Sequence, residues 1–332
     1  MSWPPPSLSV MTKLVAIDLG GTHVRFALAE VEKGRVVNCS DAVTLRTADY
    51  ASLQTAWEAF AQQAGPLPRA AAIAVAAPIS GEVLRLTNNA WTIRRALIHE
   101  TLNVDRYTLI NDFEAVGHAV ALAHANAFVP LCGPDIGLPE TGAISIVGPG
   151  TGLGVALLLR HAHGYHVQAT EGGHVDFAPL DSIDDAILQR LRGRHRRVSV
   201  ERIVSGPGLV EIYEALAAIE GRAVAQLDDK ALWTLGLSGA DSLAAAAIDR
   251  FCLALGSIAG DIALIHGSTG VVIAGGLGQR IRETLLHSGF AARFRAKGRY
   301  EALMTAIPVK IVTRDQPGLF GAAAAFVREH GD

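Results

Sequence analysis

The sequence predicts an α/β fold with two similar lobes, and three observations lead to this prediction. Runs of apolar, β-branched residues alternate with stretches of helical spacing along the whole chain. A strand–glycine–strand hairpin near the start recurs from Ile144, which suggests a duplicated domain. The chain has 332 residues, of which 50% are hydrophobic and 18% charged, and this length suffices for two domains of ordinary size.

The first hairpin has apolar strands over 14–19 and 24–28, joined by the turn Gly20-Gly21-Thr22. Glycine lets backbone N–H groups approach an anion closely, and successive N–H groups form a nest for phosphate oxygens. Asp18 ends the first strand, where a carboxylate suits a phosphate pocket only if a cation lies between them. An ordinary hairpin with Asp18 as a turn acceptor is the alternative.

The second hairpin has apolar runs on both sides of the turn Gly148-Pro149-Gly150-Thr151-Gly152. Its glycine spacing is similar to a dinucleotide-binding fingerprint, but that motif requires a helix directly after the glycines. The β-like run Val155–Leu159 follows instead, so we interpret the segment as a hairpin. Gly275–Gly278 does precede an expected helix, whose N-terminus suits part of a nucleotide, and a tight strand-to-helix turn is an equal alternative.

Between the hairpins, the expected elements follow from apolar spacing and from glycine and proline breaks. The segment 52–64 has apolar residues at helical spacing and stops at Gly65-Pro66. The continuous apolar run 71–77 is closed by Pro78, which is typical of a central strand. The other elements expected here are strands at 36–38, 82–86 and 107–110, and helices at 97–102 and 114–127.

The second half repeats much of this plan. A helix is expected from about Ser182 and another over 209–218, with Pro207 where a missing N–H costs little. A long helix from Asp241 places its apolar residues along one face, namely Leu243, Ala247, Phe251, Ala254 and Ile258. The other elements expected here are strands at 270–274 and 309–313, and helices at 275–286 and 317–328.

Composition argues against several classes of function. The net charge of −3 gives no reason to expect a nucleic-acid partner, and we interpret the arginine-rich run 190–202 as a solvated helix end and loop. Three isolated cysteines are typical of a reduced, cytoplasmic protein without disulfides. Charges interrupt the apolar segment 242–266, which favours a buried helix over a membrane span. Residues 1–12 are expected to be a disordered leader rather than a signal peptide, with Met11 as an alternative start.

Polar residues near the ends of expected strands are candidates for chemistry. Asn111 and Asp112 end a strand, where ligands collect in α/β sheets; a carboxylate there can accept a hydroxyl proton. The alternative is an Asp that caps the next helix. Glu171 and His174, close together on a glycine-bearing loop, can offer an acceptor and a donor to ligand hydroxyls. Glu201, an acid among arginines, is ordinarily half of a surface ion pair.

These motifs occur together in one known family. The chain resembles the bacterial glucokinases of the proteobacterial type, which are hexokinase-like sugar kinases of the actin-like ATPase superfamily. The matching segments run in family order over nearly the whole chain: AIDLGGTHVRFAL (16–28), INDFEAV (110–116), GPGTGLGVA (148–156), EGGHVDFAP (171–179), VSVERIVSGPGLVEIYEAL (198–216), VVIAGGLGQRI (271–281) and DQPGLFGAAA (315–324).

The resemblance implies a duplicated, ribonuclease H-like fold with two lobes. A small domain would span 13–122 plus 316–332, a large domain would span 123–315, and the active site would lie in the cleft between them. The implied reaction is the ATP-dependent phosphorylation of D-glucose to glucose 6-phosphate, the first step of glycolysis.

The resemblance also assigns roles to residues of this sequence. Asp112 would be the base that accepts the proton of the sugar 6-hydroxyl. The sugar pocket would consist of Asn88, Asn111, Asp112, Glu171, His174 and Glu201. The first phosphate turn would consist of Asp18, Gly20, Gly21 and Thr22, with Asp18 near a Mg²⁺ ion, through water. The second would consist of Gly148, Gly150, Thr151 and Gly152, and the adenosine would lie beside Gly275, Gly276 and Gly278.

Glucose and Mg-ATP are therefore the expected ligands, and a homodimer is the expected assembly. The broader ROK group of sugar kinases carries a cysteine-rich zinc motif after its sugar-binding histidine; this sequence lacks that motif, so no structural zinc is expected. A kinase for another hexose, such as mannose or fructose, is an open alternative. A sugar-sensing regulator would need a DNA-binding module, for which the residues before Leu14 are too few. A chaperone-type ATPase would have no use for the sugar-pocket residues.

Overall fold

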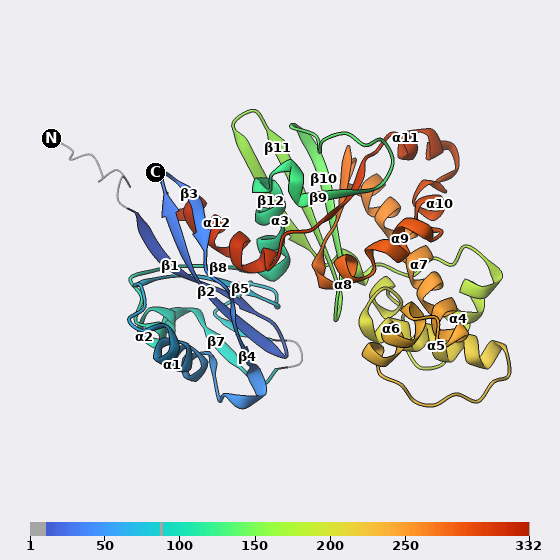
Figure 1. Cartoon of the computed structure of the whole chain (residues 1–332), viewed down its shortest axis with the longest axis horizontal. Coiled ribbons are helices and arrows are strands. Elements are labelled where there is room, and N and C mark those ends of the chain that lie inside the picture. The colour runs from blue at the N-terminus through green and yellow to red at the C-terminus, as the bar shows by residue number, and fades with distance from the viewer. Residues whose placement is uncertain (1–10, 87–88, 332) are drawn as a thin grey trace. The chain divides into compact units, whose positions relative to one another are not determined.

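The computed structural model describes residues 11–86 and 89–331, and these form two compact units (Figure 1). Unit 1 comprises the described residues up to 123 together with those from 314 onward, and unit 2 comprises residues 124–313. The first strand begins at Thr12, the last residue of the expected leader, and residues 1–10 lie outside the described part.

Unit 1 is built on a mixed sheet with the strand order β3-β2-β1-β5-β8, and β4 pairs with β2. The first three strands pair antiparallel, whereas β1, β5 and β8 run parallel, which confirms the first hairpin and the central strand. The strands are β1 (Thr12–Leu19), β2 (His23–Glu32), β3 (Arg35–Cys39), β4 (Val43–Arg46), β5 (Ala70–Val75) and β8 (Arg106–Asn111), with β6 (Val83–Arg85) and β7 (Thr92–Arg94) in a separate ribbon.

Helices cover both faces of this sheet, as Figure 1 shows. Successive residues of a strand point to opposite faces. Accordingly, Ile17 lies in a core with Trp57 and Phe60, whereas its neighbour Ala16 lies in an alanine-rich core with Phe326. The helices of unit 1 are α1 (Leu53–Ala64), α2 (Ile98–Leu102), α3 (Asp112–Leu122) and α12 (Pro317–His330), with short 3-10 turns η1 (Thr47–Asp49) and η2 (Arg95–Leu97).

Unit 2 repeats the sheet plan of unit 1. Its order is β12-β11-β10-β13-β14-β9, so three antiparallel strands are again followed by two parallel ones, and β9 pairs antiparallel with β14 at the edge. The prediction of two similar lobes is therefore confirmed, as is the second hairpin. The strands are β9 (Phe128–Cys132), β10 (Gly142–Pro149), β11 (Leu153–His161), β12 (Gly164–Thr170), β13 (Gly270–Ile273) and β14 (Val309–Val312).

The long helix α7 (Ser242–His266) forms the centre of the helical layer of unit 2. Its predicted apolar residues Leu243, Ala247, Phe251, Ala254 and Ile258 are all buried. No helix within 11–86 or 89–331 is both long and apolar enough to cross a membrane. The other helices are α4 (Ser182–Arg192), α5 (Gly206–Ile219), α6 (Asp229–Leu237), α8 (Gly275–Arg280), α9 (Arg282–His287), α10 (Phe290–Arg295) and α11 (Glu301–Thr305), with 3-10 turns η3 (Ala125–Ala127), η4 (Gly172–His174), η5 (Val200–Arg202) and η6 (Gly298–Tyr300).

Two predicted helices have different limits. The helix expected over 114–127 is α3, which begins at Asp112 because the Asn111 side chain caps it, and which ends where Ala123 turns to extended backbone. The helix expected over 275–286 is divided between α8 and α9. Ile281 separates them and is fully buried, so packing of this side chain decides a break that helical spacing does not show.

Close packing of α12 on α3 depends on Gly321. A side-chain carbon there would collide with the carbonyl oxygen of Ala115 in α3. We expect Gly321→Ala to lower the free energy of unfolding of unit 1 by about 1–3 kcal/mol, because one helix must shift. Denaturant titration checks this, with Gly137→Ala as control, since a side chain at Gly137 meets no atom within 4 Å. A Gly321→Ala variant as stable as the control would show that the two helices are not so close.

Candidate active site

The candidate residues of unit 1 lie at one edge of its sheet. In the parallel strands β1, β5 and β8, Leu19 pairs with Val75, and Val75 pairs with Asn111. Two strand spacings separate the end of β1 from the end of β8, which is about 10 Å. The sheet therefore brings Asp18 and the turn after it to the same carboxyl edge as Asn111 and Asp112, which is where ligands bind in α/β sheets.

Asn111, rather than Asp112, caps helix α3. Its side-chain oxygen accepts hydrogen bonds from the N–H groups of Phe113 (2.8 Å) and Glu114 (3.3 Å), and its amide nitrogen donates to the carbonyl of Ala77 (3.3 Å). Asp112 is the first residue of the helix, and one carboxylate oxygen accepts from the N–H of Phe113 at 2.9 Å. The partial positive charge of the helix N-terminus therefore lies beside this carboxylate at the sheet edge.

The carboxylate of Asp18 has a cation beside it, which is Arg25 of the same hairpin. The two residues are directly opposite in the β1–β2 register, and Arg25 Nη1 lies 3.2 Å from Asp18 Oδ2. The Asp18 side chain is 20% exposed. Burial raises the pKa of this carboxyl above its usual range, while the charge and hydrogen bond of Arg25 oppose the rise. Arg25 was not among the residues predicted from the sequence, although counting back equally from the pair Gly20 and His23, which closes the turn, places Arg25 opposite Asp18.

The turn of the first hairpin presents free backbone donors. Gly20 donates its N–H to the carbonyl of His23 at 3.0 Å, which closes the turn. The N–H groups of Gly21 and Thr22 have no acceptor among the described residues. Gly20 does not adopt the left-handed backbone region, so its backbone conformation does not require glycine.

The turn of the second hairpin has a matching arrangement. Gly150 donates to the carbonyl of Gly152 at 2.8 Å, and the N–H groups of Thr151 and Gly152 find no acceptor in the described part of the chain. The carbonyl of Gly150 accepts from the N–H of Gly206 at 2.8 Å, which places the start of α5 against the turn. Each hairpin thus presents two consecutive N–H groups, a concave arrangement that suits an anion.

Three predicted sugar-pocket residues of unit 2 gather around Leu153, the first residue of β11. The N–H of Leu153 donates to Glu201 Oε2 at 2.8 Å, and a side chain at Gly173, between Glu171 and His174, would collide with its carbonyl oxygen. The loops that carry these residues are also joined by backbone hydrogen bonds between 175–177 and 198–200. Glu201 therefore contacts the glycine turn rather than the arginines beside it in sequence.

Gly152 lies directly against Glu201. A side-chain carbon at Gly152 would lie 2.5 Å from Glu201 Oε2, so the carboxylate would have to move from the position in which it accepts from Leu153. Glu171 and His174 are exposed, and His174 Nε2 lies 4.0 Å from Glu171 Oε2. Their outward polar groups remain available to a ligand, as the sequence analysis expects of an acceptor and a donor on one loop.

The Gly275–Gly278 segment starts helix α8 beside the second turn. Gly275 has a left-handed backbone (φ +83°), and a side chain there would lie 3.1 Å from the carbonyl oxygen of Pro149. The helix has no side-chain cap. Gly276 is exposed and a side chain there would meet no protein atom, whereas one at Gly278 would press on Ile273. The predicted Asn88 lies outside the described residues.

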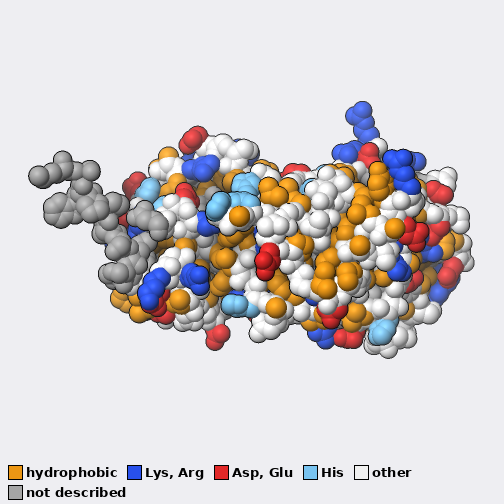
Figure 2. Space-filling model, turned by 90° about the horizontal axis from the view of Figure 1, so that it is seen from above, with side chains coloured by type: hydrophobic (Ala, Val, Ile, Leu, Met, Phe, Trp, Pro, Cys, Tyr) orange, Lys and Arg blue, Asp and Glu red, His pale blue; other side chains and the backbone are white. Residues whose placement is uncertain are grey.

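Three arginines of the basic run 190–202 are paired with acidic side chains, namely Arg190, Arg194 and Arg197. Arg194 contacts Glu211 and also Glu214 at 3.2 Å, and Arg197 pairs with Asp176 at 2.5 Å. On the face drawn in Figure 2, acidic and basic side chains are interspersed among hydrophobic ones. These pairs favour the interpretation of this run as a solvated helix end and loop.

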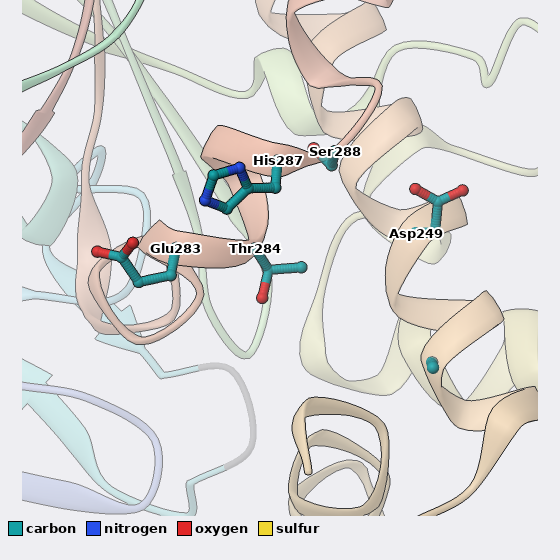
Figure 3. A pocket seen from close by; sticks show the side chains of 6 residues that line it. Asp249, Glu283, Thr284, His287 and Ser288 are labelled. Carbon is teal, nitrogen blue, oxygen red and sulfur yellow. The ribbon is translucent and has the colours of Figure 1, made fainter. Parts of the chain in front are cut away.

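A cavity of about 330 Å³ lies in another part of unit 2, between α7 and α9 (Figure 3). Glu283, which lines it, is paired with Arg282 at 2.8 Å. This cavity is separate from the predicted substrate site, because none of the predicted residues lines it. Its lining consists of Ala245, Asp249, Glu283, Thr284, His287 and Ser288.

The pairing of Asp18 with Arg25 predicts a pH-dependent loss of stability in Arg25→Met. Well below about pH 3.9 the Asp18 carboxyl is protonated in both the folded and the unfolded chain. There the substitution lowers the free energy of unfolding only through lost packing. As the pH rises, the unfolded chain ionises first, and the folded chain must then hold a buried carboxylate without its partner. The difference in unfolding free energy between wild type and Arg25→Met therefore grows between pH 4 and pH 7.

Denaturant titrations across this pH range measure the difference. The matched control is the same substitution in an Asp18→Asn background, where the cost should not change with pH. An Arg25→Met cost that is constant with pH in the wild-type background would contradict the pairing.

Comparisons with known proteins agree with this fold. A model of the family described as Glucokinase matches residues 14–329. The glucokinase of Zymomonas mobilis subsp. mobilis is 58% identical over 321 residues, which cover 96% of this chain and 99% of that protein. The crystal structure of glucokinase from an Antarctic psychrotroph has a TM-score of 0.81 and 34% identity, and the match covers 95% of this chain and 99% of that one.

A more distant structure shares the fold. The ROK family glucokinase from Streptomyces griseus, in complex with glucose and AMPPNP, has a TM-score of 0.64 at 16% identity, with 96% of this chain and all of that one covered. The two repeated units thus form the two-lobed actin-like ATPase fold of these sugar kinases. The match over nearly the whole chain shows that this chain belongs to the glucokinase family.

Proposed function

We propose that this protein catalyses the ATP-dependent phosphorylation of D-glucose to glucose 6-phosphate. The observation that carries the proposal is the pair of glycine turns, each with two consecutive N–H groups that have no acceptor among the described residues. Phosphoryl transfer requires positioning and charge neutralisation more than covalent help from the protein, and such turns supply both. Family membership supports glucose as the acceptor, because the most similar relatives are named glucokinases.

The nucleotide would bind to both turns through its phosphates. Gly21 and Thr22 in unit 1, and Thr151 and Gly152 in unit 2, would donate their N–H groups to phosphate oxygens. A side chain at Gly150 would meet only one protein atom, at 4.0 Å, so the protein itself does not require glycine there. Close approach of a phosphate gives a physical reason for that glycine. The open backbone at Gly276 would border the adenosine.

Asp18 fits the position next to a magnesium ion. A side-chain carbon at residue 318, which is glycine, would lie 3.0 Å from the Asp18 carboxyl carbon and would press on the carboxylate. Mg²⁺ usually keeps several waters and needs only one or two carboxylates together with substrate phosphates. A lone carboxylate is therefore sufficient, although the described residues hold no cluster of three or more candidate metal ligands. When bound, Mg²⁺ would neutralise part of the charge of the triphosphate.

Asp112 would act as the general base. In the proposed step its carboxylate accepts the proton of the glucose 6-hydroxyl, and the hydroxyl oxygen forms a bond to the γ-phosphorus. The bond between that phosphorus and the bridging oxygen breaks, and ADP leaves with the electron pair. The position of Asp112 at the N-terminus of α3, fixed by the Asn111 cap, supports this role because it aims a charged carboxylate at the ligand edge.

The remaining polar residues would bind the sugar. Glu171 and His174 have exposed side chains, and Glu201 is held by the N–H of Leu153, so its second carboxylate oxygen is available for a sugar hydroxyl. Asn111 uses its side chain to cap α3 and to contact Ala77, so its binding of sugar hydroxyls would need the remaining amide proton. Asn88 completes the proposed set.

Further parts of the proposal concern the setting of the enzyme. We expect units 1 and 2 to be the small and large domains of the kinase, and we expect a homodimer, which a solution mass would test. The three cysteines are free, and burial raises the pKa of Cys132 to about 11 and of Cys252 to about 12. Protonated, unbridged thiols support a reducing, cytoplasmic setting, where the product would enter glycolysis.

The reaction is tested by ADP release from Mg-ATP with glucose, mannose, fructose, galactose, N-acetylglucosamine and no sugar. We expect turnover with glucose well above every other sugar, because a sugar with a missing or inverted hydroxyl leaves a pocket acceptor or donor unpaired. Turnover with a different hexose alone would keep the mechanism and change the substrate. Equal ADP release with and without sugar would refute the kinase proposal.

Asp112→Asn tests the role of the base. We expect kcat to fall by about 10²- to 10⁴-fold, the usual contribution of a general base, while glucose affinity by calorimetry changes far less. The matched control is Asp185→Asn, which makes the same substitution at an exposed acidic residue in the first turn of α4. If Asp112→Asn turned over at the rate of the control, the proton would have another acceptor.

A further inference from the structure

Thr47 makes two hydrogen bonds to the turn of the first hairpin. It begins the short turn η1 directly after β4, and its side chain and backbone together are 4% exposed. Its hydroxyl Oγ1 donates to the carbonyl of Gly21 at 2.9 Å, and its backbone N–H donates to the carbonyl of Thr22 at 3.0 Å. Two consecutive carbonyls of the turn are thus held by one residue that lies 26 positions away in the chain from Gly21.

Because the peptide bond is planar, the hydrogen bond from Thr47 to the Gly21 carbonyl also fixes the direction of the Thr22 N–H. In a trans peptide the C=O and the following N–H lie in one plane and point in opposite directions. Because the carbonyl of Gly21 points at the Thr47 hydroxyl, the N–H of Thr22 must point away from it, toward the open side of the turn. That N–H is one of the two donors of the turn without an acceptor in the described chain.

The second turn, in unit 2, also has one carbonyl held by a donor from outside the turn, but this donor is a backbone N–H. The carbonyl of Gly150 is held by the N–H of Gly206, so the N–H of Thr151 points away from α5. In both units an outside donor fixes the carbonyl of the peptide whose N–H is left free. The repetition indicates that the arrangement serves the free N–H groups, since the two donors, a threonine hydroxyl and a helix N–H, share no other feature.

We propose that Thr47 is a positioning residue, which orients the Gly21–Thr22 peptide so that its N–H binds a phosphate of the nucleotide. This inference rests on the proposed function, because it assumes that the first turn receives Mg-ATP. The hydroxyl of Thr47 does not touch the nucleotide itself. It adds to the other hydrogen bonds of the turn a restraint on the rotation of the Gly21–Thr22 peptide, and so it pre-organises the donor.

Thr47→Val tests the proposal, because it removes the hydroxyl with little change in shape. We expect the KM for Mg-ATP to rise about tenfold, equivalent to about 1.4 kcal/mol, with a smaller change in kcat and in the KM for glucose. The Kd of Mg-ADP, measured by calorimetry, should weaken by a similar factor. Thr47→Ser, which keeps the hydroxyl, should restore most of the affinity.

The matched control is Thr55→Val in α1. Thr55 also uses its hydroxyl locally, in a reciprocal pair with Ser52 at the start of that helix, far in sequence from the turn. This variant should lose thermal stability without any change in nucleotide affinity. Unchanged Mg-ADP affinity in Thr47→Val, or failure of Thr47→Ser to restore a loss, would overturn the proposal.

A second measurement covers the case in which Thr47→Val does not fold. In the wild-type protein, the amide resonance of Thr22 should shift on addition of Mg-ADP, because its proton would bind a phosphate oxygen. An unshifted Thr22 amide at saturating Mg-ADP would also overturn the role of Thr47. If wild type neither bound Mg-ADP nor released ADP with any sugar, the proposed function itself would fail, which calorimetry and the sugar assay reveal separately.

Discussion

The pairing of two consecutive antiparallel strands at the centre of each sheet is the constraint on which the rest of the structure depends. β1 lies between its hairpin partner β2 and the parallel strand β5, and β10 lies in the same way between β11 and β13. The turn of each hairpin is therefore held from both sides and projects from the carboxyl edge of the parallel strands. The glycines of both turns lie outside the left-handed backbone region, so the free N–H groups arise there without unusual backbone angles.

The two units share one arrangement of central strands, but their candidate site residues come from different kinds of elements. In unit 1 the carboxylates at the edge belong to a strand and a helix: Asp18 is the last residue but one of β1, and Asp112 begins α3. In unit 2 the acidic and imidazole groups come from loops that meet at the backbone of Leu153, whose N–H holds Glu201. Rigid strands and helix ends thus position the proposed base and the Mg²⁺ neighbour, while loops supply the proposed sugar contacts, which suits groups that must adapt to a ligand.

The negative charge of a carboxylate near the proposed phosphate turns needs a positive or hydrogen-bonding partner, and each of three carboxylates has one. Asp18 is paired with Arg25, Glu201 accepts a backbone N–H, and Asp112 lies at a helix N-terminus. Each arrangement lowers the cost of keeping a charge near the turns. In the proposed reaction a triphosphate would approach Asp18, and a divalent cation would then compensate negative charge there, as Arg25 compensates the charge of the carboxylate.

The sequence alone determined the fold class, both hairpins, the core of α7 and the edge position of Asn111 and Asp112, because apolar periodicity and strand ends are local signals. It predicted Gly148–Gly152 as a turn and rejected a dinucleotide fingerprint, since β11 was readable in the residues that follow. Only the tertiary structure decided that Ile281 divides α8 from α9, that Glu201 contacts Leu153, and that Thr47 holds Gly21. These are contacts between segments distant in the chain, and no local pattern of side chains encodes which distant backbone group a hydroxyl or carboxylate will meet.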